Sequence, residues 1–167
     1  PIVEEDGSVT MIFKGRDYIG NDKYSDMALG IAKAKHIEGP YEVQNNNQPI
    51  FQVNGQGEAE DPFLWKDKEG YHIIFKDHVG KYTVESKAGA MAHSKDAIRW
   101  TVDKDAQAYS KTVEWEDGTV TTQGQLERPF ILFENDNPAY IFFATMDGPG
   151  GFDNATRSWN MVIPIAK

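Results

Sequence analysis

Two short motifs place carboxylates just ahead of a proline, and these residues have the types and spacing that suit acid–base chemistry. The motifs read Glu60-Asp61-Pro62 and Glu127-Arg128-Pro129. When two carboxyl groups lie close together in a narrow space, the pKa of one of them is raised, so that it can keep its proton near neutral pH. The motifs therefore predict an acid–base or ligand-binding site if the fold brings Asp61 and Glu127 together.

Both motifs belong to a longer pattern that the chain repeats. Pro1, Pro62 and Pro129 each begin a short apolar run, which leads into a turn of Asp, Asn, Gly or Glu and then into a second apolar run. A further apolar segment follows about 30 residues after each proline. A period of about 60 residues that keeps its internal spacing predicts repeated structural units. The third segments of the repeats are Gly30–Ala32, Ala90–Ala92 and Asn160–Val162.

Composition limits the classes of partner that the chain can have. With 167 residues, 40% of them hydrophobic and 12% aromatic, the chain is long enough and apolar enough for one domain with a core. Its net charge of −9 argues against binding to nucleic acid or to an anionic membrane surface. A neutral or cationic small ligand is the expected partner.

Metal and thiol chemistry find little support in the sequence. The chain has no cysteine, and no pair among its four histidines has the spacing of metal ligands on a helix, so we expect no metal and no cofactor. A calcium ion in a central channel is likewise unsupported.

The sequence lacks a membrane-spanning run and a signal peptide. Because it opens on Pro1 within a repeat, we expect a mature or truncated product.

Strand signals dominate the local patterns. The run Ser8–Phe13 alternates in polarity and predicts a half-buried strand. The runs Tyr71–Phe75 and Ala139–Phe143 are continuously apolar and predict strands that are covered on both faces. The segment Thr112–Thr122 has Asp-Gly between two β-rich arms and predicts a hairpin. Turns are expected at Glu5–Gly7, Asp67–Gly70 and Asn135–Pro138.

These elements predict an all-β fold built from β-propeller blades. Each repeat supplies three or four strands without an intervening helix, and radial packing of small sheets covers their faces. A two-sheet sandwich is the alternative, but a sandwich need not repeat at this period. We expect approximate blades at 1–56, 57–110 and 111–167, with boundaries near Gly55–Gly57 and within Asp103–Lys111. Because three blades do not close a ring, we expect an open propeller or one completed by another chain.

The repeats carry a resemblance to a known family. The segments Ala59–Trp65, Gly70–His78 and Ala88–Asp96 are similar to blades of the five-bladed propeller glycoside hydrolases of family 43. So are Gly39–Glu42 with Gln48–Ile50, and the segment Leu126–Phe130. The resemblance covers nearly all of the chain as three consecutive blades.

The resemblance implies a role for each carboxylate motif. Asp61 matches the residue that tunes the pKa of the acid and orients the substrate, and Glu127 matches the general acid. The general base would lie just before Pro1, and Arg128 stands where the family usually has glycine. Glycoside cleavage needs a protonated carboxyl on one side of the bond and a carboxylate on the other. The alternative for Asp61 is a turn residue before a strand-starting proline.

Four further side chains are candidates for contacts with a sugar. Asp77 and His78 end a predicted strand near the channel mouth and can contact hydroxyl groups, although such a pair is also typical of a polar loop. Arg128 can pair with Asp61 or Glu127. Trp65 can stack on a sugar ring, although aromatics at repeated blade positions are usually packing residues.

The preferred function is that of a glycoside hydrolase-like protein that cleaves or binds oligosaccharides or polysaccharide side chains. A non-catalytic carbohydrate-binding propeller or oligomeric scaffold without the general base is the alternative from another class, and a phosphorylase on the same fold is a third. Carbohydrate is the expected partner, and a homo-oligomer that covers the open blade edges is a further expectation. An extracellular or periplasmic location is favoured.

Overall fold

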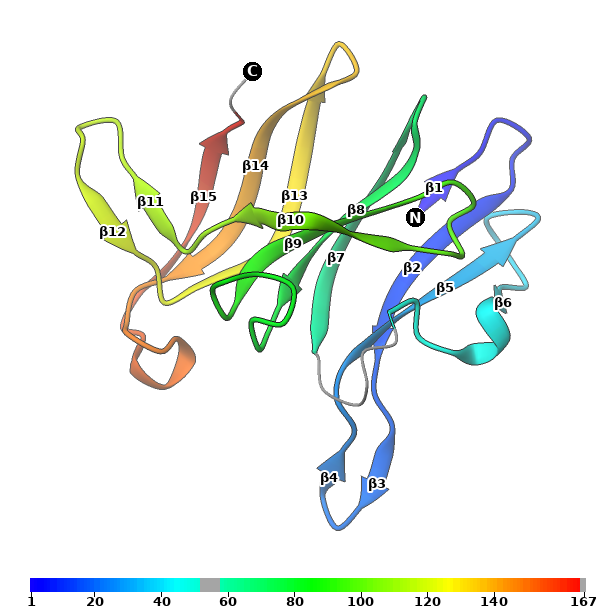
Figure 1. Cartoon of the computed structure of the whole chain (residues 1–167), viewed down its shortest axis with the longest axis horizontal. Helices are drawn as coiled ribbons and strands as arrows, with labels where there is room; N and C mark the ends of the chain where they lie inside the picture. The colour runs from blue at the N-terminus through cyan, green and yellow to red at the C-terminus, as the bar shows by residue number, and fades with distance from the viewer. Residues whose placement is uncertain (52–57, 166–167) are drawn as a thin grey trace.

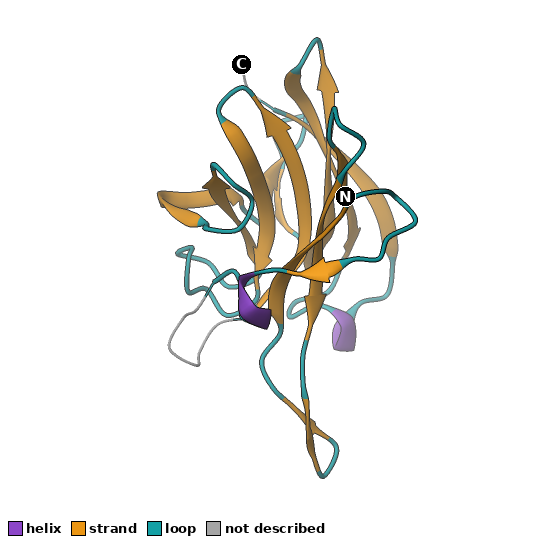
Figure 2. Ribbon diagram, turned by 90° about the vertical axis from the view of Figure 1, so that its right-hand side faces the viewer, coloured by secondary structure: helices purple, strands orange, loops and turns teal. Residues whose placement is uncertain are grey.

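Strands make up nearly all of the regular structure. The computed structural model describes residues 1–51 and 58–165, and the helical elements among them are two 3₁₀ turns, η1 (Asn45–Asn47) and η2 (Phe152–Asn154). Figure 2 shows these two turns in purple against an otherwise β-rich ribbon. The predicted all-β class is therefore confirmed. Neither of the described helical turns is long enough to cross a membrane.

Three antiparallel sheets form the body of the molecule. The first sheet has the order β1-β2-β5-β6, the second β10-β9-β8-β7 and the third β13-β14-β15. The first comprises β1 (Ile2–Val3), β2 (Val9–Gly15), β5 (Ala28–Ala34) and β6 (Glu42–Val43). The second comprises β7 (Ala59–Asp67), β8 (Gly70–Asp77), β9 (Ala88–Ser94) and β10 (Thr101–Tyr109). The third comprises β13 (Gln125–Glu134), β14 (Asn137–Met146) and β15 (Ser158–Pro164).

Local sequence signals account for the strand order. Antiparallel neighbours are joined by the turns predicted at Glu5–Gly7, Asp67–Gly70 and Asn135–Pro138, because each turn lies between two consecutive paired strands. The predicted Asp-Gly hairpin is also present as β11 (Thr112–Glu114) paired with β12 (Val120–Thr122). A second hairpin joins β3 (Tyr18–Gly20) to β4 (Lys23–Tyr24). The expected boundary near Gly55–Gly57 lies outside the described residues.

The three sheets pack against one another in a row, and the second sheet lies between the first and the third. Figure 1 shows the first sheet in blue and cyan, the second in green and the third in yellow to red. One core joins the first two sheets through residues that include Leu29, Ile31, Ile73 and Phe75. A separate core joins the second and third sheets through residues that include Ile74, Tyr109, Ile141, Phe143 and Met161. Each interface is thus built from alternate side chains of neighbouring sheets, as in stacked blades.

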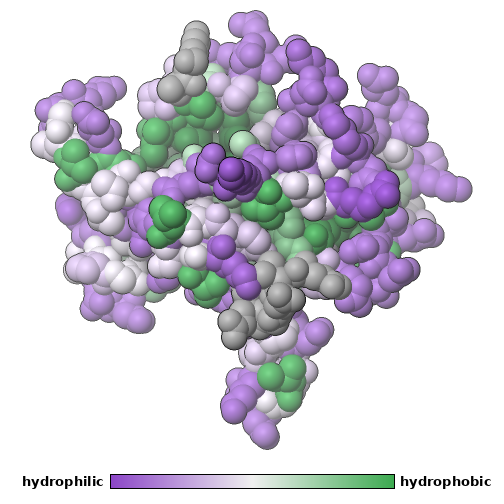
Figure 3. Space-filling model, viewed as in Figure 1, coloured by the Kyte–Doolittle hydropathy of each residue, from purple (hydrophilic) through white to green (hydrophobic). Residues whose placement is uncertain are grey.

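The outer face of the third sheet remains uncovered among the described residues. The run Tyr71–Phe75 is mostly buried, as predicted, but Ala139–Phe143 alternates between buried and exposed. The prediction that both faces of this second run are covered is therefore wrong, because among residues 1–51 and 58–165 the third sheet packs against a neighbouring sheet on one face only. Figure 3 shows hydrophobic side chains in the region of β13, β14 and β15. Five large apolar side chains are exposed on this face: Phe130, Leu132, Tyr140, Phe142 and Val162.

Candidate functional site

A β-bulge follows the glutamate of each carboxylate–proline motif. Glu60 pairs with Lys76 and Phe63 with Ile74, so the two residues between them on β7 lie opposite one residue of β8. Glu127 pairs with Ala144 and Phe130 with Phe142, which is the same irregularity on β13. Proline has no N–H to donate to the ladder, and a bulge is one of the few places where a sheet accepts it. Glu60 and Glu127 are therefore equivalent positions, as are Asp61 and Arg128.

A buried lysine joins the two glutamates. The Nζ atom of Lys76 lies 2.5 Å from Oε1 of Glu127 and 3.1 Å from Oε1 of Glu60. Only 1% of Lys76 is exposed, so water contributes little to the stabilisation of its charge. The two carboxylates, which come from neighbouring sheets, supply the opposite charge that a buried ammonium requires.

A second lysine connects the first sheet to the same group. Lys14, at the end of β2, places Nζ 3.1 Å from Oε2 of Glu60 and 2.9 Å from Oδ1 of Asp61. Oδ2 of Asp61 in turn accepts a hydrogen bond of 3.2 Å from the backbone N–H of Arg128. All three sheets thus contribute to one group, Glu60, Asp61, Glu127, Lys14 and Lys76, which we call the carboxylate–lysine cluster.

The electrostatics of the cluster are clearest at Glu60. Burial by itself raises the pKa of this carboxyl, but the charge of Lys76 and the hydrogen bonds from Lys76, Lys14 and His78 outweigh it and lower the pKa to about 2. The hydrogen bond to His78 joins its Nδ1 to Oε1 of Glu60 at 3.0 Å. Nε2 of the same ring lies 3.5 Å from Oε2 of Glu58. His78, one of the residues predicted from sequence, therefore lies beside the cluster.

Asp77 ends β8, as predicted, and its side chain is directed into the protein. Its side chain is fully buried and accepts hydrogen bonds from the backbone N–H groups of residues 80–83 and from the hydroxyl of Thr83. Because both carboxylate oxygens are used within the protein, Asp77 is not available to a sugar. The Asp77 carboxylate thus holds the loop that follows β8.

Trp65 belongs to the packing between sheets. Its ring stacks on that of His72, with the ring centroids 5.2 Å apart. It also lies beside the ring of Phe133 in the third sheet, with the ring centroids 6.2 Å apart. It also joins the hydrophobic core between the second and third sheets. The packing interpretation therefore fits Trp65 better than stacking on a ligand.

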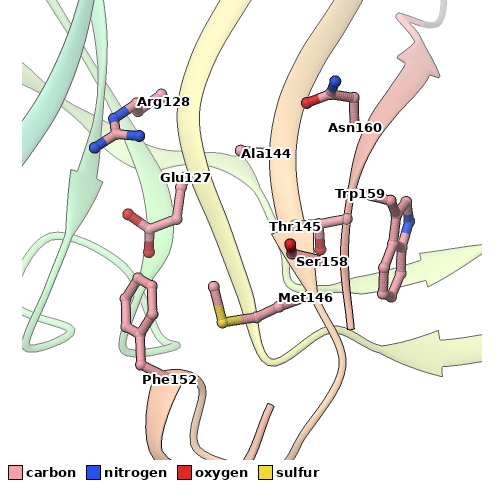
Figure 4. Close-up of a pocket in the computed structure, with 9 residues that line it drawn as sticks. All are labelled: Glu127, Arg128, Ala144, Thr145, Met146, Phe152, Ser158, Trp159 and Asn160. Atoms are coloured by element: carbon pink, nitrogen blue, oxygen red, sulfur yellow. The ribbon is translucent and has the colours of Figure 1, made fainter. Parts of the chain in front are cut away.

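A pocket of about 350 Å³ opens on the third sheet beside the cluster. Figure 4 shows Glu127 and Arg128 on β13, with the Phe152 ring beside Glu127 and the side chains of Trp159 and Asn160 beyond β14. The lining residues come from β13, β14, β15 and η2: Glu127, Arg128, Ala144, Thr145, Met146, Phe152, Ser158, Trp159 and Asn160. The pocket thus combines aromatic, polar and charged groups, which is the mixture that small-ligand sites use.

The hydrogen-bond partners of Glu127 decide what its carboxylate can do. Besides Lys76, the amide of Gln125, oriented to satisfy both of its neighbours, donates to Oε1 of Glu127 at 3.1 Å and accepts from Lys87 at 3.1 Å. A general acid must instead present a proton to the leaving oxygen. In this arrangement Oε1 of Glu127 accepts hydrogen bonds from both Lys76 and Gln125.

The sequence did not reveal the two lysines that organise the site. Lys76 follows the apolar run Ile73–Phe75 in a mostly buried strand, and a charge in such a place requires a partner. That signal could have identified Lys76, whereas Lys14 stands near the exposed end of its strand and gives no comparable sign. Within residues 1–51 and 58–165, no group of three or more His, Cys, Asp or Glu side chains is arranged to hold a metal ion.

Comparison with known proteins gives structural but not sequence relatives. No family model and no curated protein matches the chain by sequence. A structure described as a glycoside hydrolase matches 93% of this chain and 40% of its own, with 13% identity and a TM-score of 0.62. A variant of the Bombyx mori GH32 beta-fructofuranosidase BmSUC1, in complex with sucrose, matches 88% of this chain and 28% of its own, with 15% identity and a TM-score of 0.52.

A third structure, a variant of the GH43 protein BlXynB from Bacillus licheniformis, has 12% identity and covers 98% of this chain and 39% of its own, but its TM-score of 0.47 is too low to carry an argument. The chain thus spans less than half the length of the structures that it matches. At these identities the likeness concerns the fold alone, and it supports the predicted β-propeller blades.

Proposed function

We propose that this protein binds carbohydrate in the pocket beside Glu127, and that Glu127 acts there as a hydrogen-bond acceptor and not as a proton donor. The ion pair between Glu127 and the buried Lys76 is the observation that carries this proposal. An acceptor of this kind suits the hydroxyl groups of a sugar, which need both donors and acceptors around them.

The other lining residues support the same ligand class. Trp159 offers an aromatic ring, and a flat apolar ring is the usual partner for the C–H face of a sugar. Ser158 and Asn160, the neighbours of Trp159 on β15, also line the pocket and supply neutral donors and acceptors. A pocket of about 350 Å³ has the size of a site for one small molecule, which here corresponds to a short stretch of a glycan.

Calorimetric titration with a panel of neutral and acidic oligosaccharides tests the proposal. We expect saturable binding that Trp159→Ala weakens by about tenfold or more, since a buried stacking contact contributes on the order of 1 kcal/mol or more. Trp115→Ala is the matched control, because Trp115 lies on the β11–β12 hairpin outside the pocket lining. Equal binding by wild type and Trp159→Ala, or none by the wild type, would contradict the proposal.

Hydrolysis is the second candidate, with Glu127 as general acid and Asp61 as its modulator. The hydrogen bond from the Arg128 backbone to Asp61 favours it, because it holds Asp61 next to the residue that follows Glu127. On this alternative the protein releases reducing sugar from oligosaccharides, and Glu127→Gln abolishes the release while the fold survives. Sugar release that is unchanged in Glu127→Gln would exclude Glu127 as the acid.

A further inference from the structure

The geometry points to a sugar that carries a carboxylate, a uronic acid, with the guanidinium of Arg128 as the group that recognises it. This inference rests on the proposed function and specifies its ligand. The observation behind it is that Arg128 lines the pocket while its guanidinium has no ion-pair or hydrogen-bond partner among residues 1–51 and 58–165. The other cations around the site have partners.

The contrast with the neighbouring lysines is direct. Lys14 pairs with Glu60 and Asp61, and Lys76 pairs with Glu60 and Glu127. Lys87 donates to the backbone carbonyl of Gly150 at 3.3 Å. Arg128 differs from these lysines because, among residues 1–51 and 58–165, its side chain has no ion pair or hydrogen bond.

The backbone at Arg128 supports a role for its side chain. Arg128 has a backbone φ of 53°, in the left-handed region that residues other than glycine rarely adopt. The bulge and the hydrogen bond from its N–H to Asp61 hold it there. Strained residues and bulges occur preferentially at functional sites, where they redirect a side chain.

The equivalent residue of the second sheet provides an internal comparison. Asp61 has a φ of 50°, so the same conformation occurs at both bulges. The Asp61 carboxylate, however, pairs with Lys14, whereas Arg128 lines the pocket and its guanidinium has no partner in the described part of the chain. At the bulge residue with positive φ, the second sheet thus has an ion-paired aspartate, and the third sheet has an arginine whose guanidinium has no partner among the described residues.

A carboxylate fits this cation better than a phosphate does. A guanidinium binds a carboxylate through two parallel N–H···O bonds, and one unit of charge meets one. A phosphate carries nearly two negative charges at neutral pH, and here it would lie against Glu127 in the same pocket. The ring hydroxyls of a uronic acid can at the same time donate to the Glu127 carboxylate.

Binding measurements with pairs of charged and uncharged ligands distinguish the contribution of the carboxylate from that of the sugar ring. Oligosaccharides of galacturonic or glucuronic acid are titrated beside their methyl esters of equal length and beside a hexose phosphate. We expect at least one free acid to bind about tenfold or more tightly than its ester and than the phosphate, since a bidentate charged pair is among the stronger polar contacts. Tighter binding of the phosphate, or equal binding of acid and ester, would overturn the inference.

Three variants identify the responsible residue. Arg128→Gln and Arg128→Gly should abolish the preference for acid over ester, and the glycine variant suits the left-handed backbone, so that its fold should persist. Arg16→Gln is the matched control, because Arg16 lies over the ring of Tyr24 on the distant β3–β4 hairpin. A preference that survives both Arg128 variants would contradict the inference alone, whereas a failure of the wild type to bind any glycan would contradict the proposed function as well.

Discussion

The second and third sheets contain the same bulged Glu-x-Pro motif at the same ladder position, yet one site is filled and the other is open. In the second sheet the glutamate faces Lys76, and in the third it faces Ala144. Across the next strand, Lys76 pairs with Gly89, whereas Ala144 pairs with Asn160. The difference shows that the backbone sets the positions and that a few side chains decide whether a position is structural or accessible to a ligand.

Gly89 illustrates how the second sheet fills its site. A Cβ atom on Gly89 would lie 2.0 Å from Cε1 of Tyr109, so the absence of a side chain makes room for that ring. The Tyr109 ring then packs against Phe143 of the third sheet with centroids 4.6 Å apart. The third sheet has no comparable cover within the described residues, and its pocket occupies the corresponding face.

The largest expected effect is the difference in stability between truncating a core residue and truncating a residue of the uncovered face. Phe75→Ala should reduce the free energy of unfolding by about 3–5 kcal/mol, because Phe75 is 0% exposed between the first two sheets. Phe142→Ala, on the uncovered face and 37% exposed, should cost about 1 kcal/mol or less. Urea unfolding measures both. Equal losses would show that the outer face of the third sheet is in fact covered.

A smaller effect separates the buried lysine from the exposed one. Lys76→Met should lower the free energy of unfolding by about 3 kcal/mol, because it leaves Glu60 and Glu127 without their shared buried cation. Lys14→Met is the control, since the Lys14 side chain is 41% exposed and such pairs contribute about 1 kcal/mol at most. If the two variants were equally stable, Lys76 would not be the central residue of the cluster.

The smallest effect is a pH dependence that is specific to the second sheet. The folded-state pKa of Glu60, about 2, lies below its ordinary value of 4.5, so its ionised form stabilises the fold above that value and the contribution is lost as pH falls toward 2. Glu60→Gln should flatten the loss of stability over this window by on the order of 2 kcal/mol. Glu116→Gln, in the exposed β11–β12 turn, is the control. An unchanged acid limb of the stability curve in Glu60→Gln would contradict the expected role.

The sequence predicted those parts of the fold that local signals determine. Alternating runs, Asp-Gly turns and repeated prolines place the strands of each sheet, because strand pairing through short turns depends on neighbouring residues. The uncovered face of Ala139–Phe143 could not be predicted in this way, since its composition equals that of a strand covered on both sides. What lies against a strand is decided by the neighbouring sheets, which the pattern does not record.

For the candidate site as well, the sequence predicted the residues that belong to local motifs and missed those that depend on the packing of sheets. Asp61 and Glu127 could be found because each belongs to the carboxylate–proline motif of its repeat, although the strand pairing makes Glu60, and not Asp61, the equivalent of Glu127. His78 and Arg128 follow from their proximity in sequence. Lys14 could not be found, because its partners come from a different repeat and their meeting depends on how two sheets stack. The direction of the Asp77 carboxylate, which turns inward to residues 80–83, could not be predicted, because a polar pair at a strand end gives no sign of it.

The central place of the second sheet has a consequence for how the molecule opens. Each sheet gains its cover from its immediate neighbours, and the second sheet has one on either side. Its backbone amides, above all those of β8, should therefore exchange with deuterium last, while those of β15 and β6 should exchange through local fraying. The protein then has an order of opening that runs from both outer sheets toward Lys76 and its two glutamates.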